Sequence, residues 1–335
     1  VVGETMKAFA GFTTAVMGAG VAITKSAVEQ YAEYEQLVGG VETLFKDSAG
    51  QVEGYANNAY KTAGMSANQY MNTVTGFSAS LLQSLDGDTK AAAEKADMAI
   101  TDMSDNANKM GTSIDSIQTA YQGFAKQNYT MLDNLKLGYG GTKEEMQRLL
   151  DDATKLSGVK YDISSYADIV DAIHVVQTEM GITGTTAKEA STTIEGSINS
   201  TKAAWSNLLT GFANDEADVG ALITDLCDSV ATAANNLIPR VIQAVTSIVE
   251  NVPIIIQGLA GTLTTVFQEG QGLITSLMQP LVDAFFGLIN AAIALLPTLL
   301  PEVLNAAISL FQGILDGLNQ TSPNLLAMPP VLIQN

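Results

Sequence analysis

The acidic stretch around the single histidine is the part of the sequence closest to a chemical site. His174 follows Asp162, Asp168 and Asp171, and Asp171 lies three positions before it. Residues three apart share one face of a helix, so these two side chains could bind one ligand together. A zinc site needs several His or Cys ligands, and the chain offers only Cys227 besides this histidine. We therefore expect His174 to be structural and predict no metal site.

No motif for covalent or acid–base catalysis is complete. The chain lacks the Gly-x-Ser-x-Gly nucleophile elbow, and a serine triad would have to use His174 on a polar helix face. Cys227 is alone, so it forms no disulfide within the chain, and we expect it to be buried in a helix. Paired carboxylates for glycoside cleavage have no spacing rule, but such an enzyme would bring more aromatic residues than the 6% present. We predict no catalytic residue, no cofactor and no enzyme activity, and keep an envelope-degrading enzyme as the third alternative.

A glycine-rich stretch, Leu137-Gly138-Tyr139-Gly140-Gly141, could suggest a phosphate-binding loop. A Walker motif ends in Gly-Lys-Ser/Thr, whereas here Thr142 precedes Lys143. A helix start explains the stretch better, because Thr142 and Glu145 have the spacing of a capping box. The same spacing predicts helix starts at Ser66 with Gln69, Ser165 with Asp168, and Thr186 with Glu189.

The charge of the chain restricts its partners. The 335 residues have a net charge of −19 and a pI near 4.2. Binding to nucleic acid through phosphates requires clustered Lys and Arg, which this sequence lacks. We therefore predict no specific nucleic-acid binding.

Helical periodicity predicts an all-α, elongated and oligomeric assembly of short helical modules. For residues 1–46 we predict a Gly/Ala-rich apolar helix and an amphipathic helix. Residues 47–135 predict a small module with helices starting near Ser66, Thr89 and Ser113. Residues 136–236 form a second module in which Trp205 is expected to be a core anchor, and 321–335 an irregular tail.

Residues 237–320 differ from the rest, because all eight prolines lie beyond Ile238. Residues 299–310 repeat the pattern of 237–248, including a Leu-x-Pro start. Since proline suits the first turn of a helix, we expect helices laid end to end and restarted near Pro239, Pro253, Pro280 and Pro301. Steps of three and four predict an oligomer seam with a wide apolar stripe, hence a trimer or larger bundle. The seam residues are Ile238, Val241, Val245, Ile248, Val252, Leu300, Leu304, Ala307, Phe311, Ile314 and Leu318.

Membrane insertion is the competing interpretation of this segment. Residues 251–268 and 284–301 carry no charge, and each approaches the roughly 20 apolar residues of a spanning helix. Prolines interrupt both stretches, acids flank them, and no Lys or Arg stands beside them as an anchor. The alternatives are therefore an intersubunit bundle, conditional insertion after a trigger, and a membrane-perforating or pore-forming protein.

Several stretches form a combination that is more specific than any one of them alone. They are residues 34–45, 63–71 and 137–145, the helix with Trp205 and residues 207–211, and the Leu-x-Pro repeats. Taken together, these stretches resemble the tape measure proteins of long-tailed bacteriophages of low-GC Gram-positive hosts and of related tail-like particles.

The resemblance implies a structural role without active-site residues, in a segment of a longer tape measure protein. Such proteins set tail length during assembly, lie in the tube lumen and tail tip of the virion, and leave before the DNA to help it cross the host envelope. The implied partners are further copies of the chain, tail tube, distal tail and hub or baseplate proteins, and transiently the host membrane. Helical length suits a ruler, because a helix rises about 1.5 Å per residue.

Overall fold

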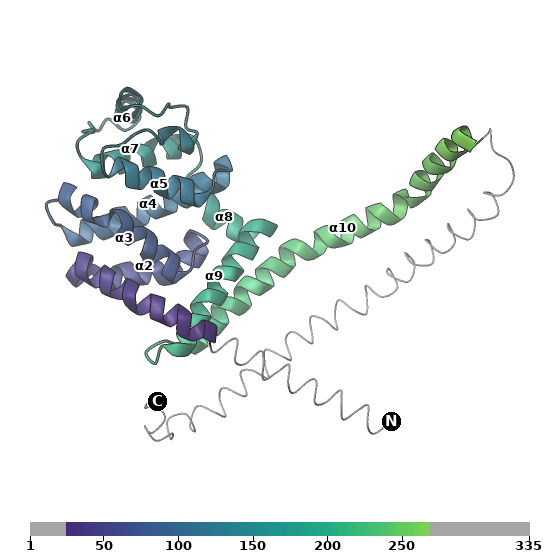
Figure 1. The fold of residues 1–335 in the computed structure, drawn as a ribbon, viewed down its shortest axis with the longest axis horizontal. Coiled ribbons are helices and arrows are strands. Elements are labelled where there is room, and N and C mark those ends of the chain that lie inside the picture. Colours follow the sequence, from purple (N-terminus) through teal and green to yellow (C-terminus); the bar gives the residue numbers. More distant parts are fainter. Residues whose placement is uncertain (1–24, 268–335) are drawn as a thin grey trace, which may run out of the picture. The chain divides into compact units, whose positions relative to one another are not determined.

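The structure, a computed structural model, describes residues 25–267, and every regular element in that range is helical (Figure 1). The all-α prediction is therefore confirmed for this part of the chain. Residues 25–45 form a helix that continues through Gly39 and Gly40. The following elements are η1 (Lys46–Ser48), α2 (Ala49–Thr62), α3 (Ala67–Ser84), α4 (Thr89–Met110), α5 (Ile114–Phe124), η2 (Leu132–Leu135), α6 (Lys143–Ser157), α7 (Tyr166–Glu179), α8 (Thr185–Thr192), α9 (Ile194–Ala213) and α10 (Val219–Phe267).

Local capping chemistry sets several of these helix starts. The capping box at Ser66 is complete: its Oγ accepts from the Gln69 N–H at 3.3 Å, and Gln69 Oε1 accepts from the Ser66 N–H at 3.0 Å. The Ser165 cap of α7 is also confirmed. Thr142 caps α6 as predicted, but the Glu145 carboxylate accepts from the Gly140 N–H at 3.0 Å instead of from Thr142.

The start of α8 differs from the prediction. Thr186 is buried in the first turn, and Gly184 occupies the N-cap position without a side chain to offer. Asp105 of α4 takes over this role, since its carboxylate accepts from the Gly184 N–H at 2.5 Å and from the Thr186 N–H at 2.7 Å. The predicted pair of Thr186 and Glu189 is wrong, because a buried carboxylate from a distant helix satisfies the free N–H groups.

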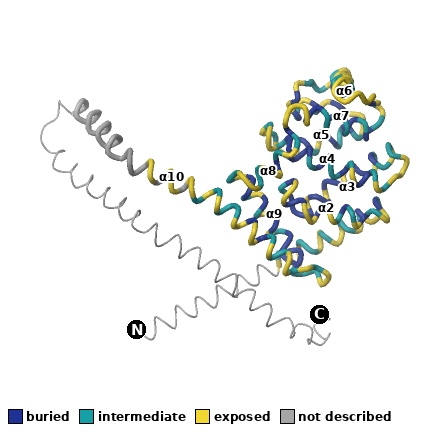
Figure 2. The backbone as a smooth tube through the Cα atoms, turned by 180° about the vertical axis from the view of Figure 1, so that it is seen from behind, coloured by how far each residue is buried: buried dark blue, intermediate teal, exposed yellow. Residues whose placement is uncertain are grey.

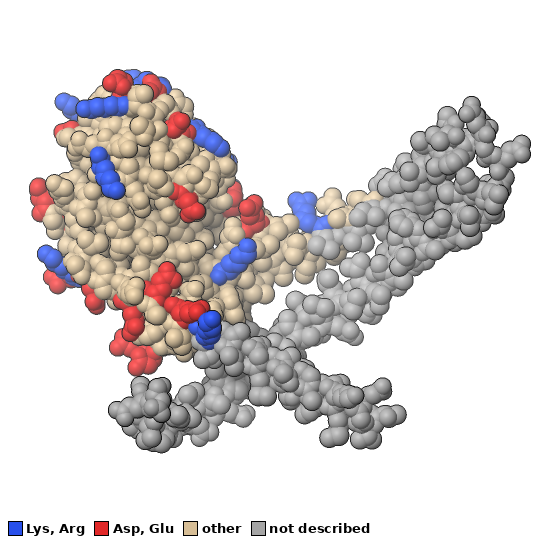
Figure 3. All heavy atoms as spheres, in the orientation of Figure 1, with Lys and Arg blue, Asp and Glu red and all other residues tan. Residues whose placement is uncertain are grey.

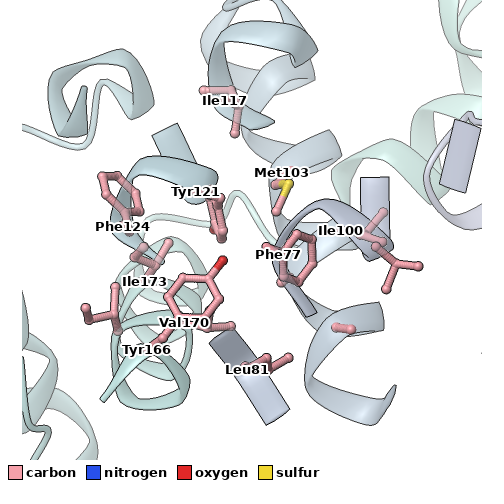
Figure 4. Close-up of a cluster of buried hydrophobic side chains, with 14 of the residues drawn as sticks. Phe77, Leu81, Ile100, Met103, Ile117, Tyr121, Phe124, Tyr166, Val170 and Ile173 are labelled. Carbon is pink, nitrogen blue, oxygen red and sulfur yellow. The ribbon is translucent and has the colours of Figure 1, made fainter. Parts of the chain in front are cut away.

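One buried cluster joins the helices from residues 25–45 to α7. In Figure 4, Phe77 and Leu81 of α3 and Ile100 and Met103 of α4 lie near side chains of α5 and α7. Figure 2 shows the buried residues on the inward sides of these helices. The buried residues of α3, α4 and α5 recur at helical spacing, so each of these helices turns one face toward the core. The cluster includes residues from both sides of the expected module boundary at 135/136.

The helix α10 runs through two prolines. Its 49 residues include Pro239 and Pro253, so the prediction that helices restart at these two positions is wrong. Each proline removes one backbone hydrogen bond from the helix, and the helix continues past both positions. Pro280, Pro301, the second repeat and residues 1–24 lie outside the described residues.

The chain divides into two units, Val1–Pro239 and Arg240–Asn335. The helices α2 to α9 belong to the first unit, and α10 contributes residues to both.

Candidate functional site

The lone histidine is bound to a buried carboxylate. His174 of α7 places its Nδ1 2.9 and 3.0 Å from the two carboxylate oxygens of Asp102 on α4. The Asp102 side chain is only 1% exposed, while that of His174 remains partly accessible. The hydrogen bond with Asp102 raises the pKa of His174 above its ordinary value. This pair therefore favours a protonated imidazole held against a buried acid.

The other acids of the predicted cluster have separate partners. Asp171 forms an ion pair with Lys95 of α4. Asp168 accepts from the Asp162 N–H at 2.8 Å, which closes the loop before α7. Within residues 25–267, no group of three or more His, Cys, Asp or Glu side chains is placed to hold a metal ion. The four sequence candidates are therefore used for helix capping and packing.

Amide side chains continue this polar network through the helical unit. Asn106 Nδ2 donates to Gln177 Oε1 at 2.8 Å and to the Leu135 carbonyl at 3.0 Å, joining α4, α7 and η2. Burial in the same region raises the pKa of the Tyr121 hydroxyl well above its usual value. Among the described residues no Ser, Thr or Cys side chain hydrogen bonds to His174. The imidazole thus lacks the bonded nucleophile that a triad requires.

Two residues expected inside the protein are on its surface. Trp205 is 39% exposed and Cys227 is also exposed, so both predictions are wrong. The buried side of α9 consists mainly of small and polar residues. At Gly196 an added Cβ would lie 2.4 Å from the Glu189 carbonyl oxygen. Trp205 lies on the side of α9 that faces away from these buried residues.

The N-terminal part of the predicted seam lies on α10. Ile238 is half-buried, while Val230, Leu237 and Ile242 nearby are 45%, 40% and 57% exposed. Val241, Val245, Ile248 and Val252 have helical backbone, but their side chains lie outside the description. The other seam residues, Leu300, Leu304, Ala307, Phe311, Ile314 and Leu318, fall outside the described part of the chain. The seam remains a prediction.

The length and hydropathy of the described helices bear on the membrane interpretation. None of them is both long enough and apolar enough to cross a bilayer. Residues 251–267 of the first uncharged stretch are part of α10, while residues 284–301 lie outside the description.

Charges of both signs are distributed over the visible face of the helical unit, with acidic side chains gathered toward one end (Figure 3). Tyr31 lies near Glu35, Asp215 and Glu216, so the first helix and the turn before α10 bring carboxylates together. Tyr31 also stacks on Tyr34, with ring centroids 6.1 Å apart.

The first unit has two hollows, each with a volume of about 410 Å³. The sequence patterns did not indicate either of them. They share Gly64, Gln69 and Asn199 among their lining residues, so they adjoin. Their walls come from the first helix, from the turn between α2 and α3, and from α3, α4, α5, α8 and α9. No local motif marks them, because residues from across the sequence form the lining.

The chain has no match among protein-family models, curated proteins or solved structures. The class that the described residues define is an all-α protein whose helical unit is joined by buried polar links.

Proposed function

We propose that the chain is part of a virion structural protein of the tape measure type, which sets phage tail length during assembly. The observation that supports this most is α10, a single helix of 49 residues. At roughly 1.5 Å per residue this helix is roughly 74 Å long. A continuous helix converts residue count into distance, which a molecular ruler requires.

The exposed apolar side chains of α10 support association with further copies. Leu237 and Ile242, which are next to the seam residues Ile238 and Val241 in the sequence, are large apolar residues on the surface of this helix. Burial of apolar surface against a partner helix is favourable by roughly 25 cal/mol per Å². In the proposed role, three copies of the chain associate along the seam as a homotrimer inside the tail tube. They contact tube, distal tail and hub proteins and leave the tube on infection to reach the host membrane.

Deletion within α10 tests the ruler role in the assembled particle. Removal of residues 231–248, five helical turns, keeps the faces of the remaining helix in register. We expect tails shorter by about 27 Å, and longer by about the same amount when these residues are duplicated. Electron micrographs of purified tails measure both lengths. Unchanged tail length in both variants would refute the ruler role of α10.

A further inference from the structure

The two adjoining hollows form what we call the amide groove, lined by the residues around Gly64, Gln69 and Asn199. Side-chain amides dominate its polar lining, while Glu33, Asp115 and Lys202 are its charged members. No aromatic residue lines either hollow. The amides are Gln30, Asn68, Gln69, Asn72, Asn108, Gln118 and Asn199.

Hydrogen bonds within the protein fix one of the two polar atoms in several of these side-chain amides. Asn68 Nδ2 donates to the Gln30 carbonyl at 2.9 Å, and Gln118 Nε2 donates to Thr73 Oγ1 at 2.9 Å. Gln69 Oε1 is held by the Ser66 N–H. An amide fixed at one end has its orientation set in advance, so a ligand that binds the other end loses less entropy.

Two buried polar atoms of the groove lining lack a partner. Asn68 Oδ1 and Ser104 Oγ have no hydrogen bond within the described residues. Asn68 is 3% exposed and Ser104 is 5% exposed. An unsatisfied buried polar group costs roughly 1–3 kcal/mol, and both atoms lie beneath the surface of the lining, where a ligand reaches them only after a local movement. Each residue lines one hollow, Ser104 the first and Asn68 the second.

Small residues leave room for a main chain to approach the groove. Ala63, Gly64, Ala107, Ala190 and Gly196 line the first hollow. Positions without large side chains allow another backbone to come close. A peptide unit also presents one N–H donor and one C=O acceptor, the same pair that a side-chain amide offers in return.

We propose that the amide groove binds an extended peptide segment of a partner protein whose side chains are small and uncharged. The amides pair with its main chain, and the small lining residues accommodate its side chains. Phosphate ligands fit poorly, because Lys202 is the only cation in the lining and two carboxylates oppose it. Bases and sugar rings would lack an aromatic surface for stacking. This site is independent of the proposed tail role.

The test uses the full chain and a library of N-acetylated octapeptides built from Gly, Ala, Ser, Thr, Asn and Gln. We expect the chain to enrich peptides from this library, but not from a matched library with Lys or Glu at every third position. The double variant Asn72→Ala and Asn199→Ala should weaken the binding of enriched peptides about tenfold, measured by fluorescence anisotropy. Both side chains are exposed and make no hydrogen bond in the described part, so the fold should persist.

Two further variants locate the binding. Ala107→Leu places a larger side chain in the first hollow and should also weaken binding, whereas Asn235→Ala changes an exposed amide on α10 and should leave it unchanged. Circular dichroism checks the fold of each variant. The proposal is overturned if no uncharged octapeptide binds at 1 mM, or if enriched peptides bind all variants equally. It is also overturned if tetra-N-acetylglucosamine binds the groove and the peptides do not.

Discussion

The helical unit and α10 use apolar residues in opposite ways. In the unit, Phe124 and Leu81 are buried, and polar links such as Asn106 to Gln177 connect one helix to the next. On α10, Leu237 and Ile242 are exposed. The unit therefore buries an apolar core within one chain, while α10 carries large apolar side chains on its surface. Under the proposed function, the exposed apolar side chains of α10 are the surface on which further copies of the chain bind.

Truncation of one apolar residue in each region tests this comparison most strongly. Phe124→Ala should lower the free energy of unfolding by about 4 kcal/mol, because it removes a large buried ring and leaves a cavity. Leu237→Ala should change the stability of the monomer by less than about 0.5 kcal/mol, since this side chain is already exposed. Urea unfolding at low protein concentration measures both. Similar losses in the two variants would contradict the distinction.

The buried cap of α8 predicts a somewhat smaller effect. Asp105→Ala should cost about 3 kcal/mol, because two hydrogen bonds to a carboxylate are lost and two N–H groups near the start of α8 lose their partner. The matched control is Asp88→Ala, which removes the exposed cap of α4 and should cost about 1 kcal/mol. Thermal unfolding of both variants compares a buried and an exposed cap. Equal losses would show that Asp105 acts only as a local cap.

Glycine replacements probe the close packing of the unit. Gly196→Ala should cost about 2 kcal/mol, because the new Cβ would meet the backbone of Glu189. Gly39→Ala should instead stabilise the first helix by about 0.5–1 kcal/mol, since nothing lies within 4 Å of its Cβ position and alanine favours helix. The midpoints of urea unfolding check the opposite signs. A gain in stability at position 196 would refute the close approach of α8 and α9.

Proton binding by His174 gives the smallest predicted effect. Its pKa is raised in the folded chain, so the stabilisation is fully present below its unfolded pKa near 6.5 and is lost as pH rises through the folded value. The negative charges of three nearby carboxylates also raise the pKa of His174. They belong to Asp102 and Asp105 of α4 and Asp171 of α7. We expect unfolding midpoints to fall as the pH rises from about 6.5 through the raised pKa of His174. In His174→Gln, which keeps an N–H donor but does not titrate, this slope should flatten.

Local features were predictable from the sequence because they depend on neighbouring residues. The caps at Ser66 and Ser165 follow from the spacing of neighbouring residues alone. The partner of His174 was not predictable, because Asp102 lies 72 residues away. Trp205 was misplaced because its hydrophobicity predicted the buried side of α9, which small and polar residues occupy instead. The amide groove shares this non-local origin.

The Asp105 cap has a consequence for the order in which the chain acquires its structure. α8 has eight residues, fewer than an isolated helix needs to persist in water. The carboxylate that completes its first turn belongs to a residue 79 positions before Gly184. During synthesis, α4 leaves the ribosome before α8, so the Asp105 carboxylate is already present when the residues of α8 emerge. Since Thr186 and Ala190 of α8 line the first hollow, we expect this wall of the amide groove to form only once α8 has docked on α4.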